Sequence, residues 1–121
     1  MRDHSELILR KQKDFSRVYK RGKSRGSRFV VVLYRRNNLD YTRTAFVSSK
    51  KVGNSVERNR ARRLMKEAYR SLSGRVKSGY DIVFVARNTI NERKESEVEK
   101  VMEKTMYACE LLSSVNTDKK Q

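Results

Sequence analysis

Side chains that could act as acids, bases, nucleophiles or metal ligands are few in this sequence. His4 is the only histidine and Cys109 the only cysteine, which argues against a Cys/His metal site and excludes an intramolecular disulfide. His4 stands in a segment without structural signals, and Cys109 falls on an apolar helix face as a small core residue would. Glu95, Glu99 and Glu103 recur among lysines at helical spacing, which is typical of a solvated face. We therefore predict no catalytic residue and no metal ligand in this chain.

The chemistry that the chain does offer is positive charge. Thirty lysines and arginines against fourteen acidic residues give a formal net charge of +16 over 121 residues. The segment 10–28 has nine basic residues and one acid, 50–70 has eight and two, and 92–110 has four and six. An excess that is confined to two segments indicates a binding face for a polyanion, with salt-sensitive attachment to phosphates.

The helix predicted after residue 54 carries much of this charge. Asn54 or Ser55 can cap its start, and Glu57 stands at the capping-box spacing from Asn54. Its apolar stripe consists of Ala61, Leu64, Met65, Ala68 and Leu72. The opposite arc holds Asn59, Arg62, Arg63, Lys66 and Arg70, with Arg58 and Arg60 on its flanks. A merely solvated face normally mixes charge signs. The charges on this face have almost one sign only, and the planar guanidinium of arginine can donate paired hydrogen bonds to phosphate oxygens. We therefore interpret it as a polyanion-binding face.

The remaining pattern predicts an α+β fold. Residues 14–21 form a short helix with Asp14 as its cap and Gly22 at its end, and 23–28 form a loop or a short edge strand. Strands are expected at 29–34, 42–50 and 81–86, and the longest helix at 92–114. The apolar runs 29–34 and 81–86 do not alternate, which indicates that both sheet faces are covered. The expected order is α-β-β-α-β-α, with one layer of sheet packed against helices.

Length and composition allow one domain over residues 1–121, with 1–9 and 115–121 frayed or disordered. The longest apolar run, 29–34, is too short to cross a membrane, and the first residues lack the apolar stretch of a signal peptide. These features predict a soluble, cytoplasmic, basic protein.

Three segments resemble the protein subunit of bacterial ribonuclease P. The segment 49–66 reads SKKVGNSVERNRARRLMK and contains the Arg58-Asn59-Arg60 core that marks the family. The segments KDFSRVYKRG (13–22) and GYDIVFVAR (79–87) resemble the family's first helix and last strand, so the resemblance covers nearly the whole chain. Two departures, Ser55 for alanine and Ala61 for a larger aliphatic residue, bear on packing and capping rather than on the basic face.

The resemblance implies a mixed sheet of about four strands with three helices and a left-handed βαβ crossover, whereas the general rule predicts a right-handed one. It also implies two partners, a catalytic RNA subunit and precursor tRNA, whose 5′ leader is removed by Mg²⁺-dependent hydrolysis with the metal held mainly by the RNA. We expect the RNA subunit to contact Arg58, Asn59, Arg60, Arg62, Arg63, Lys66 and Arg70, together with Lys50 and Lys51 before Gly53.

A second surface is expected between the first helix and the sheet, where the single-stranded leader would bind. Aromatic side chains stack on bases with little sequence preference, and the candidates are Phe15, Tyr19, Arg17 and Leu33. Phe15 could equally be a core residue, and the sequence leaves open whether Leu33 or Tyr34 faces this cleft.

Two other classes fit the composition. A ribosomal protein that grips structured RNA would have the same charge, and only the 49–66 motif and its companion segments argue against it. A DNA-binding helix in a major groove is the third interpretation, but the neighbouring strands predict a sheet scaffold rather than a helix-turn-helix.

Overall fold

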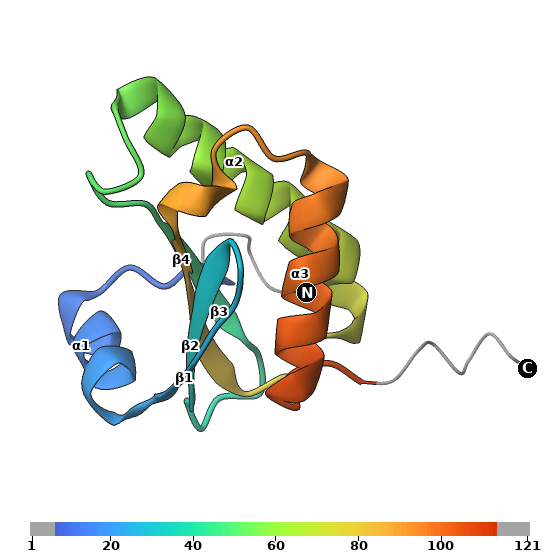
Figure 1. Ribbon diagram of the computed structural model, residues 1–121. Helices are drawn as coiled ribbons and strands as arrows, with labels where there is room; N and C mark the ends of the chain where they lie inside the picture. The colour runs from blue at the N-terminus through green and yellow to red at the C-terminus, as the bar shows by residue number, and fades with distance from the viewer. Residues whose placement is uncertain (1–6, 114–121) are drawn as a thin grey trace, which may run out of the picture.

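The protein is a sheet with one helix on one face and two on the other, as a computed structural model shows (Figure 1). The structure describes residues 7–113. Its elements are α1 (Gln12–Arg21), β1 (Lys23–Gly26), β2 (Val30–Arg36), β3 (Arg43–Val47), α2 (Ser55–Leu72), β4 (Tyr80–Ala86) and α3 (Glu95–Ala108), with 3₁₀ turns at Ser73–Arg75 and Asn88–Ile90. The predicted α+β class, three helices and mixed sheet are confirmed, and the polar segment after α1 supplies the edge strand β1.

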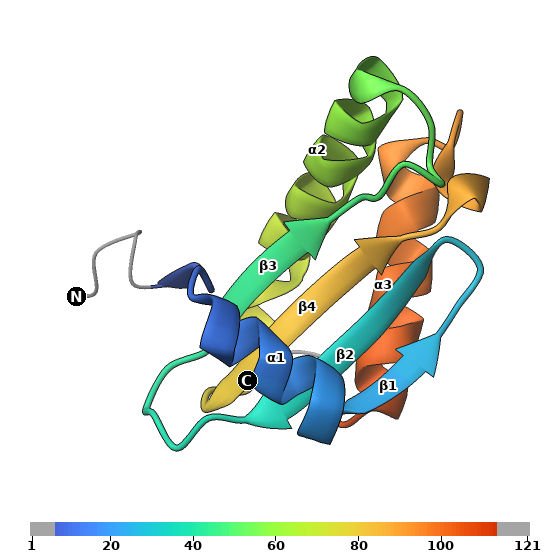
Figure 2. The ribbon, with the colours of Figure 1, turned by 90° about the vertical axis from the view of Figure 1, so that its left-hand side faces the viewer.

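The strands lie in the order β1-β2-β4-β3. β2 pairs antiparallel with β1 and with β4, whereas β3 runs parallel to β4, from Arg43 opposite Asp81 to Val47 opposite Val85. The parallel pair is joined through α2. With α1 toward the viewer, the chain leaves the end of β3, passes behind the sheet through α2 and returns one strand to the right (Figure 2). That path is a left-handed crossover, as the family resemblance implies and against the general rule.

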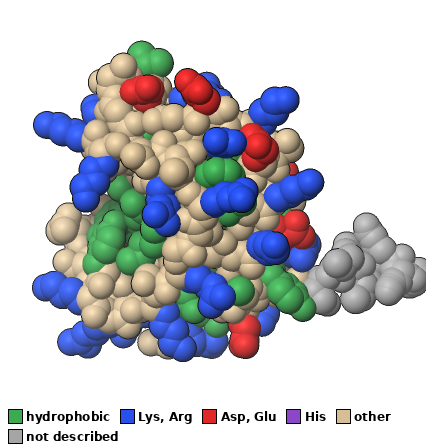
Figure 3. Space-filling model, in the orientation of Figure 1, with side chains coloured by type: hydrophobic (Ala, Val, Ile, Leu, Met, Phe, Trp, Pro, Cys, Tyr) green, Lys and Arg blue, Asp and Glu red, His purple; other side chains and the backbone are tan. Residues whose placement is uncertain are grey.

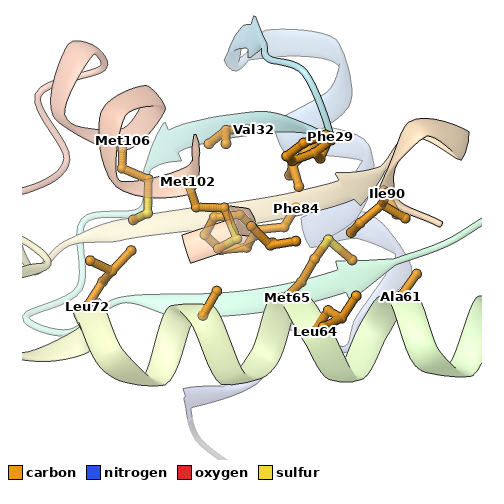
Figure 4. Packing of buried hydrophobic residues seen from close by; sticks show 14 of the residues in the cluster. Phe29, Val32, Ala61, Leu64, Met65, Leu72, Phe84, Ile90, Met102 and Met106 are labelled. Atoms are coloured by element: carbon orange, nitrogen blue, oxygen red, sulfur yellow. The ribbon is translucent and has the colours of Figure 1, made fainter. Parts of the chain in front are cut away.

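The main core lies between the sheet and the pair α2 and α3. The five apolar positions predicted for α2 are all buried, and they pack with Phe84 of the sheet and with Val98, Met102 and Met106 of α3. Figure 4 shows Met65 and Met102 converging on Phe84 from the two helices. The α2 stripe therefore fixes which side of this helix faces away from the protein.

The opposite face of the sheet is covered in part by α1. Val18 is buried with Leu9, Ala45 and Val83, and Phe15 and Leu33 pack beside them, half buried. Tyr34 packs instead against the core under α3. Leu33 is thus the residue that faces α1, and the continuous apolar runs in β2 and β4 are explained by helices on both faces.

The ends of two helices differ from the prediction. α1 begins at Gln12, and its N-cap residue Lys11 makes no side-chain capping bond. Asp14 is buried in the first turn of the helix rather than standing at the N-cap position. The helix predicted at 92–114 is shorter, Glu95–Ala108, and α2 is the longest helix. α3 ends because Glu110 adopts φ 64°, while the Leu111 N–H bonds the Met106 carbonyl at 2.9 Å in a Schellman motif.

Part of the segment predicted to fray is ordered. Leu9 is 3% exposed, its N–H donates to the Thr44 carbonyl at 2.8 Å, and Ile8 forms a parallel bridge with Thr44. The expectations for residues 1–6 and 115–121, and for His4, lie outside the described residues. None of the described helices is long and apolar enough to cross a membrane.

Candidate nucleic-acid interface

The start of α2 is fixed by a reciprocal cap. The Asn54 side chain accepts from the Glu57 N–H, and Glu57 Oε1 accepts from the Asn54 N–H, both at 2.9 Å. Gly53, at φ 145°, brings the backbone so close that a Cβ there would overlap the Glu57 carboxylate. The cap predicted from sequence is confirmed with Asn54 as its residue, and it sets where the basic face begins.

The outer face of α2 carries side chains that nothing in the described chain neutralises. Asn59, Arg63 and Lys66 are exposed, and neither Arg63 nor Lys66 has an ion-pair partner within residues 7–113. Arg70 pairs with Glu67 at 3.1 Å, but both side chains are exposed, so the pair is weak. This face can therefore exchange its counterions for phosphates at little cost in internal contacts.

Three arginines of the predicted set are held by the protein itself. Arg58 donates to the Gly53 carbonyl at 2.9 Å, Arg60 to the Arg93 carbonyl at 2.7 Å and Arg62 to Ser48 Oγ at 2.8 Å. Arg62 also donates to the Asn59 side-chain oxygen. Each guanidinium keeps further donors, so these bonds orient the forks while they tie α2 to the loops around it.

Lys50 and Lys51 lie in the turn between β3 and α2. Both are exposed, and the turn is closed by bonds from the Val52 N–H to the Ser49 carbonyl and from the Gly53 N–H to the Lys50 carbonyl. Val52 between them and the helix is buried, which anchors the turn to the core. The two ammonium groups thus extend the basic face beyond the N-terminus of α2.

The four residues predicted for the second surface share the α1 side of the sheet, but they are not equivalent. Phe15 and Leu33 are half-buried members of the small core under α1, together with Val47 and Val85. Tyr19 is 49% exposed, and partial burial raises the pKa of its phenol. Arg17 is exposed and lies 3.4 Å from Asp14. In Figure 3, hydrophobic side chains gather on this side of the molecule with lysines and arginines around them.

A buried ion network that sequence reasoning missed fastens α1 to the sheet. Arg43 donates to both carboxylate oxygens of Asp81, at 2.9 and 2.8 Å, and lies 3.4 Å from Asp14 of α1. Asn37 donates to Asp81 at 3.0 Å, and the hydrogen bonds that Arg43 donates to the Asp81 carboxylate raise the pKa of the Arg43 guanidinium. An aspartate at the start of an apolar strand was the available signal, but only the register shows its partner.

The carboxylates and the thiol do not assemble into a reactive site. Glu103 pairs with Arg75 at 2.7 Å. The pKa of Glu95 is raised, first by the slight burial of its carboxyl group and then by the negative charge of Glu99. Cys109 is half buried against the core, which raises the pKa of its thiol. Within residues 7–113 no three His, Cys, Asp or Glu side chains lie close enough to hold a metal ion. What the arrangement can do is bind phosphates and bases.

Comparisons with known proteins agree with this picture. The model of the family described as Ribonuclease P matches residues 4–110. The Ribonuclease P protein component of Alkaliphilus metalliredigens is 42% identical over 105 residues, covering 87% of this chain and 95% of its own. That of Caldanaerobacter subterraneus is 45% identical over 102 residues, covering 80% and 87%.

Solved structures show the same likeness. The RNase P protein of Staphylococcus aureus matches with a TM-score of 0.79 and 27% identity, over 88% of this chain and 98% of that one. The RNase P protein from Thermotoga maritima matches with a TM-score of 0.73 and 31% identity, over 80% and 92%.

Proposed function

The chain belongs to the family of ribonuclease P protein components, part of a tRNA-processing ribonuclease, and from this premise we propose that it works by binding two RNAs. One is the RNA subunit of the enzyme and the other is the 5′ leader of precursor tRNA. The observation that carries the proposal is the exposed face of α2, where Arg63 and Lys66 have no ion-pair partner among the described residues.

The RNA subunit is assigned to α2 and the turn before it. Phosphates would lie along Asn59, Arg63, Lys66 and Arg70, and on Lys50 and Lys51 at the N-terminal end, with the forks of Arg58, Arg60 and Arg62 held in place beneath them. Arginine binds phosphate through paired N–H donors, so pre-oriented forks lose little freedom on binding. A rigid face of this kind suits a folded RNA with fixed phosphate positions.

The leader is assigned to the α1 side of the sheet. Tyr19 offers a half-exposed ring for a base, Phe15 and Leu33 offer apolar surface beside it, and Arg17 offers a charge for phosphate. Stacking of this kind tolerates any base, which suits an enzyme that meets many different leaders. Mature tRNA has no leader, so this surface would make the protein favour precursor over product.

We assign the chemistry to the RNA subunit and its Mg²⁺. The residues that the structure describes do not fit a divalent metal, because no three candidate ligands among them lie close together. The protein contributes cations: with a net charge of +16 it neutralises phosphates where the RNAs meet. The holoenzyme should then bind substrate more tightly and need less Mg²⁺ than the RNA alone. Because precursor tRNA would be its substrate, we propose that the protein works in the cytoplasm.

The experiment that tests this function is cleavage of a 5′-labelled precursor tRNA by a bacterial ribonuclease P RNA at low Mg²⁺, with and without the protein. We expect release of the intact leader at the mature boundary only when both are present, with protein alone as the control. Tight RNA binding without stimulation would instead indicate a structural RNA-binding protein, such as a ribosomal protein. Cleavage by the protein alone would overturn the assignment of the chemistry to RNA.

A further inference from the structure

A groove wraps around the open edge of β3. Its volume is about 690 Å³, a size that small-molecule sites commonly have. Phe15 and Val47 line it on the α1 side of the sheet, and Phe46 and Tyr69 line it on the α2 side. In Figure 2, β3 is the strand at the left edge of the sheet, with α1 in front of the sheet and α2 behind it. The groove therefore joins the two faces that carry the two proposed RNA surfaces.

Aromatic rings form the α2 side of this groove. Phe46 stacks on Phe84 with ring centroids 5.2 Å apart, and Tyr69 meets Phe46 edge-on at 5.8 Å. The Tyr69 hydroxyl has no hydrogen-bond partner within residues 7–113, yet it is not sealed from solvent. A packed ring with a free hydroxyl can offer a base both an apolar surface and a hydrogen bond.

The backbone at this edge is also available. The Thr44 carbonyl is used by the Leu9 N–H, but the chain then turns away into α1. Hydrogen-bonding groups alternate along a strand, so Phe46 points its N–H and C=O in the same outward direction as Thr44. No described residue pairs with them. The groove thus has polar groups on its floor as well as aromatic rings on its wall.

The rim of the groove is positively charged. Lys66 has no ion-pair partner in the described chain, and Arg70 shares only the exposed contact with Glu67. Both lie one helical turn apart on α2, where a single anionic group could reach both. A base that packs on the rings and a phosphate that reaches the rim are parts of the same ligand, a nucleotide.

We propose that this groove at the edge of β3 binds a nucleotide of the single-stranded leader after it leaves the α1 side of the sheet. The base lies against Tyr69 and Phe46. Its phosphate lies between Lys66 and Arg70, at the border of the α2 face, where these two cations are shared with the phosphates of the RNA subunit. Phe15 and Val47 belong both to the groove and to the apolar surface assigned to the leader, so one strand can follow both. The inference rests on the proposed function, because it extends the path of the leader toward α2.

The test fills the groove without replacing any residue of either proposed surface. Ser73 is exposed at the end of α2 and lines the groove, so Ser73→Trp fills it. Ser71, exposed on the same helix and not part of the groove, gives the matched control Ser71→Trp. Binding of precursor tRNAs with leaders of increasing length, of mature tRNA and of the RNA subunit is measured for both variants and for the wild type, with the reconstituted holoenzyme where tRNA is the ligand.

Ser73→Trp should weaken binding about tenfold, the value of one lost stacked base, only for leaders long enough to reach β3. Short-leader precursors, mature tRNA and the RNA subunit should bind as they do to Ser71→Trp. An equal loss for all leader lengths, a loss in RNA-subunit affinity, or no loss at all would overturn the inference. The proposed function is read separately, from the preference of the wild-type holoenzyme for precursor over mature tRNA.

A second measurement uses a spectroscopic property of the chain. The protein has no tryptophan, so Tyr69→Trp provides a single emission signal inside the groove. A long-leader precursor should quench this emission by stacking, whereas mature tRNA should leave it unchanged. Quenching by mature tRNA, or none with any leader, would contradict the assignment of the groove to the leader.

Discussion

Replacing Arg63 and Lys66 together by alanine removes two cations from the outer face of α2 without breaking any ion pair of the described chain. Both are exposed and alanine favours helix, so stability should hold. Each lost phosphate contact makes the slope of log K against log salt shallower by about 0.7 to 0.9, hence by about 1.5 for the pair. Over a fourfold rise in salt, wild-type affinity for the RNA subunit should fall about eightfold more than that of the variant.

The assay is filter binding of the labelled RNA subunit at several salt concentrations, with thermal unfolding as a check on the fold. The matched control is Lys100→Ala with Lys104→Ala, which removes the same charge from the exposed face of α3. Its salt slope should stay that of the wild type. The assignment of the RNA subunit to α2 would be refuted if the slope of log K against log salt were the same for the wild type and the Arg63 and Lys66 variant. It would also be refuted if both double variants changed this slope equally.

Three further predictions concern the other features. Tyr19→Ala should lower the affinity for precursor tRNA about tenfold in equilibrium binding, because one stacking surface is lost, and should leave the affinity for mature tRNA unchanged. Equal losses of affinity for both tRNAs would contradict the leader assignment. Asp81→Ala leaves the half-buried Arg43 with only its 3.4 Å contact to Asp14 and should cost about 3 kcal/mol in urea unfolding. Glu67→Ala, at the exposed pair with Arg70, should cost less than about 1 kcal/mol, and similar costs for the two variants would count against the network. Burial raises the pKa of Tyr69 to about 12, so between pH 10 and 12 the unfolded chain loses this proton first and folded stability declines with rising pH. The Tyr69→Phe variant should lack this decline, up to about 3 kcal/mol, and equal pH profiles would disprove the burial argument.

The sequence predicted the elements that rest on local chemistry. The stripe of α2 from Ala61 to Leu72 and the cap at Asn54 are as expected, because period and capping depend on near neighbours. The end of α3 was missed, because Glu110 adopts a left-handed conformation that glycine normally signals. The sequence did not predict that Leu9 is ordered, because Leu9 is held by a hydrogen bond to Thr44, which is distant in sequence.

The candidate site shows the same division. Periodicity identified the outer face of α2, but it could not separate the free cations Arg63 and Lys66 from Arg60 and Arg62, which bond to distant loops. Whether Leu33 or Tyr34 faces the leader surface depends on which face of the sheet α1 covers, and the sequence does not show this. The left-handed crossover came only from the family resemblance, because handedness is set by long-range packing.

The central place of β4 bears on how this protein acquires its RNA-binding surface during synthesis. β4 pairs with β2 and β3 on its two sides, yet it follows α2 in the chain, and Val30 meets Ala86 across more than fifty residues. Such distant contacts form late in folding. On the ribosome the cations of α2 emerge before the strand that must stand beneath its apolar stripe. The rigid basic face therefore appears only once residues 80–86 have been made, so a chain cut before them would carry the same charges on an unsupported helix.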